Sequence, residues 1–346
     1  MIFLSLLPIL LLIWLWFRRE RRKVFHQIYR LTHNGIVFAE HPRLPEYTIA
    51  DPYDVPGAFH KAQLHLHTSH SLDVVEKVPV EQVIQAYKDH EYSYLVITDH
   101  NRVTDATALS REGLVVMAGM EKTERLCFSP LGKHLIVFGP REAVHPPGTL
   151  VSSPLTVRAP AHLNWQGNLG TGRWFLQDLL RRQDYQLLEI YNNKSDTLLD
   201  VWLWSYLLRQ NGWARPIWGI AVDDSDNAKP IDRGWIMIKT EGVTEEAFFA
   251  SLRRGAFYAT TGPRAIFAVR EGGIQAIAEN EGVFRFINAN NEVVAVVRGR
   301  EGSYEPRGDE VLVRVELADD NGGRAWSQPF YLIPPEDRRP PSRQPS

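Results

Sequence analysis

The sequence contains one cysteine, Cys127, among its 346 residues. A disulfide framework within the chain is therefore impossible, and a zinc site built on several thiolates is excluded. Any metal must be held by imidazole nitrogens and carboxylate oxygens. The length allows one catalytic domain of roughly 200 residues together with a smaller partner domain.

The sequence also lacks an excess of charge of either sign, since its formal net charge is -2. A nucleic-acid partner is therefore not expected, because such proteins concentrate basic residues on one face. The one dense basic run, residues 18–23, directly follows an uncharged apolar segment.

That apolar segment covers residues 2–17 and would span roughly 24 Å as a helix, somewhat short of the hydrocarbon core of a bilayer. We expect a single membrane anchor, with the basic flank and all that follows in the cytoplasm, which predicts an inner or plasma membrane protein. The alternative is an apolar helix that packs on the catalytic domain.

The sequence pattern divides the whole chain into five predicted segments. Residues 1–23 form the anchor and its basic flank, 24–57 a proline-containing linker, 58–264 the catalytic domain, 265–333 a small β-sandwich-like domain and 334–346 a disordered tail. In 58–264 short apolar strands alternate with amphipathic helices, which predicts an α/β fold with a parallel sheet or barrel. We expect helices after Pro79, across 174–182, after Ser195 and between Thr244 and Gly255.

His65 and His67 are the first candidates for metal ligands. On a strand, residues two apart face the same side, so both imidazoles can reach one ion. The alternative is a pair of unrelated surface histidines.

Further acids and histidines follow or flank other predicted strands, where the ligands of parallel barrels gather. Any one of them alone is more simply a turn, cap or surface residue. Jointly they predict a metal centre, and they are Asp99, His100, Glu121, His134, His162, Asp223, Asp224 and Asp226.

These residues lie in segments that resemble the motifs of the polymerase-and-histidinol-phosphatase (PHP) metallohydrolases. The segments are 64–68 (LHLHT) with Ser71, 97–101 (ITDHN), 119–121 (GME), 133–134 (KH), 161–162 (AH, followed by Leu163 instead of proline) and 224–226 (DSD). Within that family, 188–192 (LEIYN), 221–224 (AVDD), 257–263 (FYATTGP) and 324–329 (RAWSQP) are most similar to the carbaryl-hydrolase-like (CehA/McbA) branch.

The resemblance implies a distorted (β/α)7 barrel and a cluster of two or three divalent ions: zinc, manganese or iron. It implies a first metal on His65, His67, Glu121 and Asp224, and a second that shares Glu121 and adds His134 and His162. A third would use Asp73, preferred to the nearer His70, together with His100 and Asp226. Asp226 stands where the family usually has histidine, so this site is expected to be weaker or to favour a metal that prefers oxygen ligands.

Other residues are assigned supporting roles. Glu121 is expected to bridge two metals, and Asp99 to hold an imidazole in its ligating tautomer. Arg102, or else Lys122, is a candidate for binding an anionic substrate group. Asn192 is a further candidate for contact with the substrate, Trp165 is expected to form the floor of the pocket, and Lys133 is a third cation near the motifs.

The activity expected is hydrolysis of a small anionic phosphoester by metal-activated water. The first alternative is hydrolysis of a carbamate or carboxyl ester, as in the CehA/McbA branch. The second is a membrane-tethered binding module with a degenerate metal site. The sequence predicts neither the substrate itself nor the oligomeric state.

Overall fold

The computed structural model describes residues 43–71, 74–125, 132–145, 149–150, 155–165, 167, 171–195 and 197–335. All of them belong to one compact unit. The predictions for residues 2–17, Asp73 and most of the tail fall outside the described residues. The domain boundaries at 23, 57, 264 and 333 stay predictions.

Five strands form the half of the main sheet that carries most of the candidate ligands. Their order is β2–β3–β4–β5–β8, with β2–β3–β4 parallel and β4–β5–β8 antiparallel. They are β2 (Ala58–His67), β3 (Tyr92–Ile97), β4 (Val115–Arg125), β5 (Gly132–Phe138) and β8 (Val157–Pro160).

A separate parallel pair brings the remaining candidates to these strands. It consists of β9 (Leu187–Asn192) and β10 (Trp218–Val222). The N–H of Gln186 donates to the carbonyl of Arg158 on β8, and the N–H of Asp224 donates to the carbonyl of His65 on β2. The pair is thus tied to both ends of the five-strand group.

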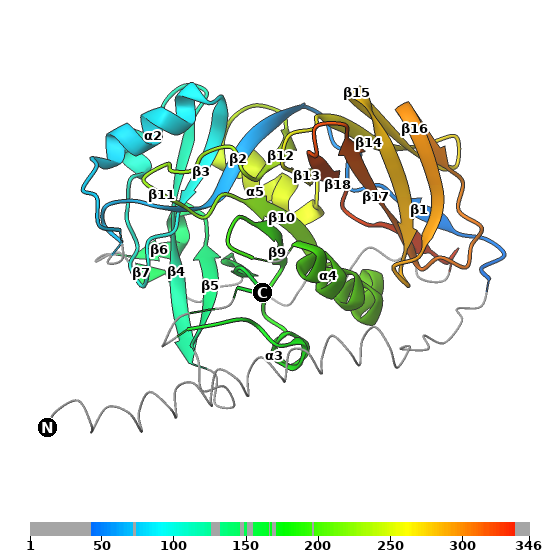
Figure 1. Ribbon diagram of the computed structural model, residues 1–346, viewed down its shortest axis with the longest axis horizontal. Helices are drawn as coiled ribbons and strands as arrows, with labels where there is room; N and C mark the ends of the chain where they lie inside the picture. The colour runs from blue at the N-terminus through cyan, green and yellow to red at the C-terminus, as the bar shows by residue number, and fades with distance from the viewer. Residues whose placement is uncertain are drawn as a thin grey trace, which may run out of the picture. The chain divides into compact units, whose positions relative to one another are not determined.

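The main sheet continues through the C-terminal half of the chain without a break. Beyond β2 the order is β12–β13–β18–β17–β19–β1, and β14 and β16 join through β15, which pairs with β17. These strands are β1 (Thr48–Ala50), β12 (Trp235–Thr240), β13 (Phe257–Thr260), β14 (Ala265–Arg270), β15 (Gly273–Asn288), β16 (Val293–Tyr304), β17 (Leu312–Asp319), β18 (Arg324–Trp326) and β19 (Phe330–Ile333). Figure 1 shows helix α2 (Val80–Asp89) at one end of the described structure and β14–β17 at the other.

The described helices are few and lie close to where the sequence predicts them. The helix expected across 174–182 is shorter than expected, and Thr244 caps its helix by accepting from the N–H of Ala247 at 3.1 Å. The α-helices are α2 (Val80–Asp89), α3 (Leu176–Arg181), α4 (Thr197–Asn211) and α5 (Glu245–Arg254). The short elements are β6 (Val144–His145), β7 (Thr149–Leu150), β11 (Ser225–Asp226), η1 (Thr107–Leu109), η2 (Arg141–Ala143) and η3 (Gly212–Ala214).

The expected distorted (β/α)7 barrel is wrong. Fifteen of the described strands form one sheet, in which β4, β5, β8, β12 and β13 pair antiparallel to a neighbour. Antiparallel neighbours need only a short connection, whereas parallel neighbours need a crossover that is usually a helix. The strand-helix alternation of the sequence therefore holds only for part of residues 58–264.

The predicted membrane anchor is also withdrawn. Within the part of the chain that the structure describes, none of the helices is long and apolar enough to cross a bilayer. Residues 2–17 lie outside that part. The predicted location in an inner or plasma membrane therefore has no support from the structure.

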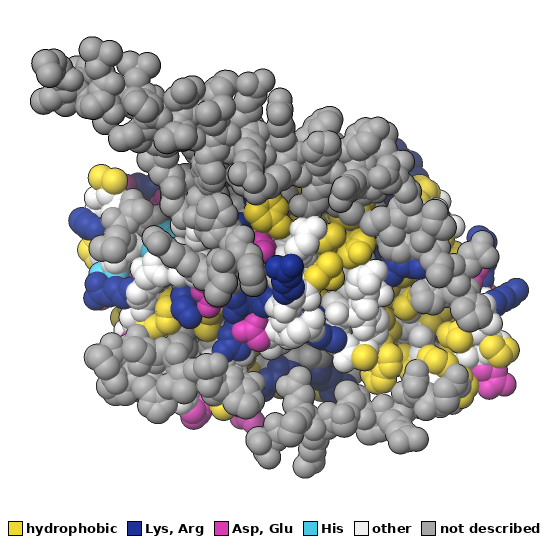
Figure 2. All heavy atoms as spheres, turned by 90° about the horizontal axis from the view of Figure 1, so that it is seen from below, with side chains coloured by type: hydrophobic (Ala, Val, Ile, Leu, Met, Phe, Trp, Pro, Cys, Tyr) yellow, Lys and Arg dark blue, Asp and Glu magenta, His cyan; other side chains and the backbone are white. Residues whose placement is uncertain are grey.

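Two clusters of apolar side chains are buried within the described part of the chain. Val83, Ile84 and Tyr87 of α2 pack on β3, whereas the C-terminal cluster includes Phe267 and Phe286. On the coloured part of the face in Figure 2, basic and acidic side chains alternate with hydrophobic ones, and histidine occupies little of the surface.

Candidate metal centre

Glu121 is the residue around which the candidate ligands gather. It lies on β4, is 1% exposed, and its N–H donates to the carbonyls of Thr98 and Asp99 at the end of β3. β4 runs through residues 119–121 and continues to Arg125. A side chain at Gly119 would come within 2.8 Å of Val96, so the close approach of β3 and β4 needs glycine here.

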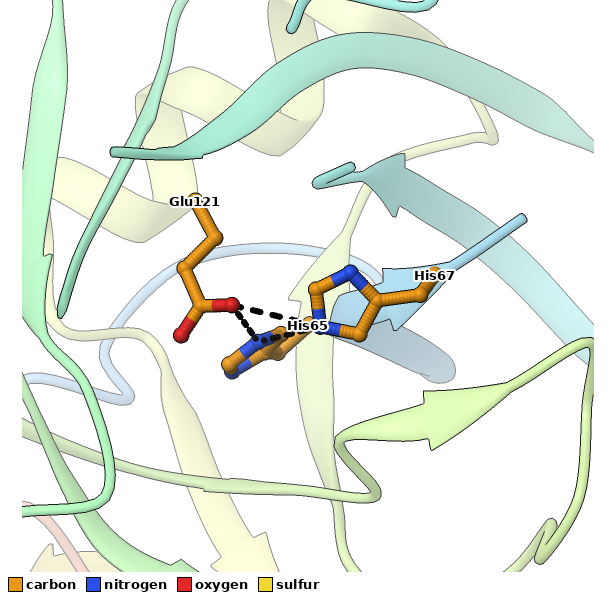
Figure 3. Close-up of side chains that lie close together, drawn as sticks. All are labelled: His65, His67 and Glu121. Carbon is orange, nitrogen blue, oxygen red and sulfur yellow. Dashed lines mark hydrogen bonds and ion pairs between the residues drawn. The ribbon is translucent and has the colours of Figure 1, made fainter. Parts of the chain in front are cut away.

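One oxygen of Glu121 faces the histidine pair of β2. Oε2 lies 3.5 Å from His65 Nε2 and 3.3 Å from His67 Nε2, and the two imidazole nitrogens are 3.2 Å apart. Figure 3 shows the three side chains converging. The alternation of side chains along a strand thus brings both imidazoles to one point, as predicted for the pair.

Asp224 approaches the same two imidazoles. Its Oδ1 lies 3.4 Å from His65 Nε2 and 3.3 Å from His67 Nε2. Atoms that bind one ion at about 2.1 Å with bonds 90–120° apart lie roughly 3.0–3.6 Å from each other. The spacing of Glu121, Asp224 and the two histidines therefore matches a shared ion.

The other oxygen of Glu121 faces a second set of imidazoles. Oε1 lies 2.9 Å from His134 Nδ1 and 2.9 Å from His162 Nε2, and these nitrogens are 3.1 Å apart. His100 Nδ1 approaches Oε2 at 3.0 Å. The structure thus contains two groups of potential ligands that share Glu121, one with His65 and His67, the other with His100 and His134.

Glu189 orients His65 from the side away from the other ligands, and the sequence did not predict this role. Its Oε1 accepts from His65 Nδ1 at 2.7 Å, and its Oε2 accepts from the backbone N–H of His162 at 2.5 Å. A neutral His65 that donates through Nδ1 carries its lone pair on Nε2, which faces the cluster. The available signal was an acid inside the apolar strand of residues 187–190, because such a charge needs a partner.

Asp99 does not have the role predicted for it. Its carboxylate accepts from the backbone N–H of Thr68 at 2.7 Å, from the Thr68 hydroxyl at 2.8 Å and from the Thr104 hydroxyl. Among the described residues no hydrogen bond joins it to an imidazole. Asp99 therefore stabilises the turn after β2, and it is Glu189 that accepts the hydrogen bond from the His65 imidazole.

The cations suggested by the sequence are not directed at the cluster. Arg102 is exposed, and exposed Lys122 pairs with Glu124 at 3.0 Å. Lys133 is fully buried and donates to the carbonyl of Arg173. Sequence proximity to a ligand therefore did not identify a substrate-binding cation.

The predicted third metal site lies only partly within the described residues and stays a prediction. Asp226 is exposed and belongs to neither group of potential ligands, and Asp73 lies outside the described residues. Asp224, with φ of 50°, is in the left-handed region, so the strand alternation that would place Asp226 beside it is interrupted. His70 Nδ1 faces the Thr104 hydroxyl at 3.4 Å.

The charges of the cluster shift the titration of its members. Burial alone would lower the pKa of His65, but Asp224, Glu121 and Glu189 outweigh it and hold this pKa well above its usual value. Burial would raise the pKa of Glu121, but His65 and its other imidazole partners hold it well below its usual value. Carboxylates that stay ionised beside basic nitrogens are suited to a divalent ion.

Two further features mark the His162 side. His162, with φ of 29°, is a non-glycine residue in the left-handed region, and its buried Nδ1 has no hydrogen-bond partner among the described residues. The Trp165 ring stacks on His134 with centroids 5.7 Å apart and meets His162 edge-on at 4.8 Å. Strained backbone and an unpaired buried nitrogen concentrate at functional sites.

The donor set therefore fits a divalent metal centre. The imidazole nitrogens and carboxylate oxygens converge at ligand spacing from β2, β4, β5 and the segments after β8 and β10. His65 is directed by Glu189, as ligating histidines are directed by carboxylates in known sites. His65, His67, Glu121 and Asp224 would hold one ion, and Glu121, His134 and His162 another.

Comparison with known proteins yields little. No protein-family model and no curated protein matches the chain. Three chains of solved structures match it. One, from Bacteroides vulgatus ATCC 8482, is described as a two-domain protein containing a predicted PHP-like metal-dependent phosphoesterase. It shares 13% identity over 84% of this chain and 89% of that chain, with a TM-score of 0.43. A likeness at this level decides neither fold nor activity, which must follow from the residues themselves.

Proposed function

We propose that the chain is a metal-dependent hydrolase of phosphoesters, related to the PHP metallohydrolases whose motifs its sequence resembles. The observation that carries the proposal is the position of Glu121, whose two oxygens face two separate sets of imidazoles. A carboxylate so placed can be shared by two ions.

The residues of the candidate metal centre would have different roles in the reaction. Divalent ions held here would lower the pKa of a water molecule toward neutrality and stabilise the charge that develops on a phosphoryl group. Glu121 and Asp224 supply the negative charge, the histidines supply the nitrogen donors, and Glu189 fixes His65 in the tautomer that presents Nε2. All of these ligands except His100 are buried, which limits the access of bulk water to their donor atoms.

The test is turnover by the purified full chain after loading with manganese, zinc or iron. Hydrolysis of p-nitrophenyl phosphate or bis(p-nitrophenyl) phosphate, lost in His67→Ala with the fold retained by circular dichroism, supports the proposal. Hydrolysis only of aryl carbamates or carboxyl esters supports the CehA/McbA-type alternative. Absence of all these activities in protein that binds two metals refutes a hydrolase of either kind.

The alternative of a binding module with a degenerate site rested on Asp226 and Leu163. Leu163 is fully buried and its carbonyl accepts from the N–H of Trp174, so it has a structural position independent of the ligands. Exposed Asp226 bears on the third site alone. Neither Asp226 nor Leu163 removes a ligand from the group that surrounds Glu121.

A further inference from the structure

We propose that Lys194 is the residue that binds the anionic group of the substrate, and that it selects a phosphomonoester dianion over less charged esters. This inference rests on the proposed function. Lys194 was not among the cations that the sequence motifs suggested, because it lies between β9 and α4, away from every ligand in the sequence.

The charged end of Lys194 lies next to the candidate metal ligands. Its Nζ lies 3.0 Å from Asp224 Oδ1, the oxygen that also approaches His65 and His67. The lysine side chain is 40% exposed, whereas that of Asp224 is 2% exposed. The ammonium group therefore stands on the solvent side of the ligand set, where a substrate from solution can reach it.

The backbone of Lys194 is fixed by the same network that fixes Asp224. Its N–H donates to Asn192 Oδ1 at 2.8 Å, while Asn192 Nδ2 donates to Asp224 Oδ2 at 3.1 Å and to Glu189 Oε2 at 2.8 Å. Asn192 is buried, so the substrate-contact role suggested for it by the sequence does not fit.

The charges of Lys194, Asp224 and a bound ion explain how Lys194 would bind the substrate. Without an ion, the ammonium neutralises one oxygen of Asp224. With an ion on that oxygen, the negative charge of Asp224 is shared, and the ammonium is available to a substrate anion beside the cluster. Lysine binds phosphate as a point charge, and each added negative charge on the phosphoryl group strengthens that attraction.

The competing interpretation is that Lys194 only stabilises Asp224. The two differ in what Lys194→Met changes in the metal-loaded full chain. Lys229→Met is the matched control, because Lys229 is also an exposed lysine paired with a carboxylate, that of Glu76 at 3.2 Å. Lys194→Arg tests whether a cation alone restores the function.

The first readout is binding of inorganic phosphate by calorimetry, which does not depend on turnover. We expect Lys194→Met to weaken phosphate binding at least about tenfold, the loss expected of one hydrogen bond between charged groups. Metal content should be unchanged, Lys194→Arg should restore most of the affinity, and Lys229→Met should bind as the wild type does. Unchanged phosphate affinity, or a loss explained by lower metal content, overturns the proposal.

The second readout is the KM for substrates of graded charge. In Lys194→Met, KM should rise for the dianion p-nitrophenyl phosphate, rise less for the monoanion bis(p-nitrophenyl) phosphate and stay unchanged for neutral p-nitrophenyl acetate, with kcat less affected. An equal effect on all three overturns the role in selectivity. If the wild type binds phosphate but cleaves none of them, the proposed function fails while the phosphate result still decides the role of Lys194.

Discussion

Gln328 binds the backbone of Gly219 with both atoms of its side-chain amide. Its Oε1 accepts from the N–H of Gly219 at 2.9 Å, and its Nε2 donates to the carbonyl of Gly219 at 2.8 Å. Gly219 lies on β10, the strand that leads to Asp224. The C-terminal part of the chain thus helps to hold a candidate metal ligand in place.

Gln328→Leu should therefore destabilise the protein. The substitution leaves the buried N–H and carbonyl of Gly219 without partners, at a cost of about 2–4 kcal/mol in the free energy of unfolding. Urea denaturation of the metal-free protein measures this cost. Gln85→Leu, on the exposed face of α2, is the control, and equal stability of the two variants would contradict the account.

Glu189→Gln should weaken metal binding without unfolding the protein. The amide keeps the size of the side chain but loses the charge that holds His65 with Nε2 toward the cluster. We expect the affinity for the metal to fall about 10- to 100-fold, as for other carboxylates behind ligating histidines. Metal titration followed by calorimetry checks it, with the exposed Glu81→Gln as control. An affinity within twofold of the wild type would show that Glu189 does not direct the ligand.

Metal affinity should rise with pH. The pKa of His65 is held well above its usual value near 6.5 by neighbouring carboxylates, and the pKa of His67 is also raised. In the metal-free protein these imidazoles therefore keep their protons to a higher pH than usual, and metal binding must displace those protons. Titration across pH 6 to 9 in two buffers of different ionisation enthalpy should show stronger binding and less proton release as pH rises. Affinity independent of pH over this range would be inconsistent with His65 and His67 as ligands.

Trp165 should report on the second group of ligands. Its ring stacks on His134 and contacts His162, so an ion bound there changes its surroundings. Metal addition should alter the tryptophan emission of the wild type, and Trp165→Phe should remove most of that change. Trp213→Phe, whose half-buried ring lies in η3, should leave the change intact. If the metal-induced change in emission is also intact in Trp165→Phe, no ion binds next to His134 and His162.

Much of the candidate site follows from short-range rules. The two-residue period of strands brings His65 and His67 together. The search for acids or histidines near the ends of predicted strands gave Glu121, His100 and Asp224, although Glu121 lies inside β4. Glu189 was missed because its partners, His65 and His162, are far from it in the sequence. Asp99 was misassigned because sequence position tells which strand ends nearby but not which way a carboxylate turns.

The fold was harder to predict for a related reason. Apolar runs show where strands lie, but they do not show whether a neighbour such as β5 runs parallel or antiparallel to β4. That choice depends on contacts between distant segments, as does the continuation of the sheet from β13 (Phe257–Thr260) through β18 to the C-terminal strands. Local helix signals, such as Thr244 and Gly255 at the ends of α5, were reliable because capping is a local interaction.

The central claim is that Glu121 is shared by two ions, and the metal content of the protein tests it most directly. Full-length wild type and Glu121→Ala should be equilibrated with manganese or zinc, passed over a desalting column and analysed by plasma mass spectrometry. The wild type is predicted to retain at least two divalent ions per chain, and Glu121→Ala to retain fewer than one while keeping its circular dichroism spectrum. Fewer than two ions in the wild type, or an unchanged content in a folded Glu121→Ala, would contradict the account.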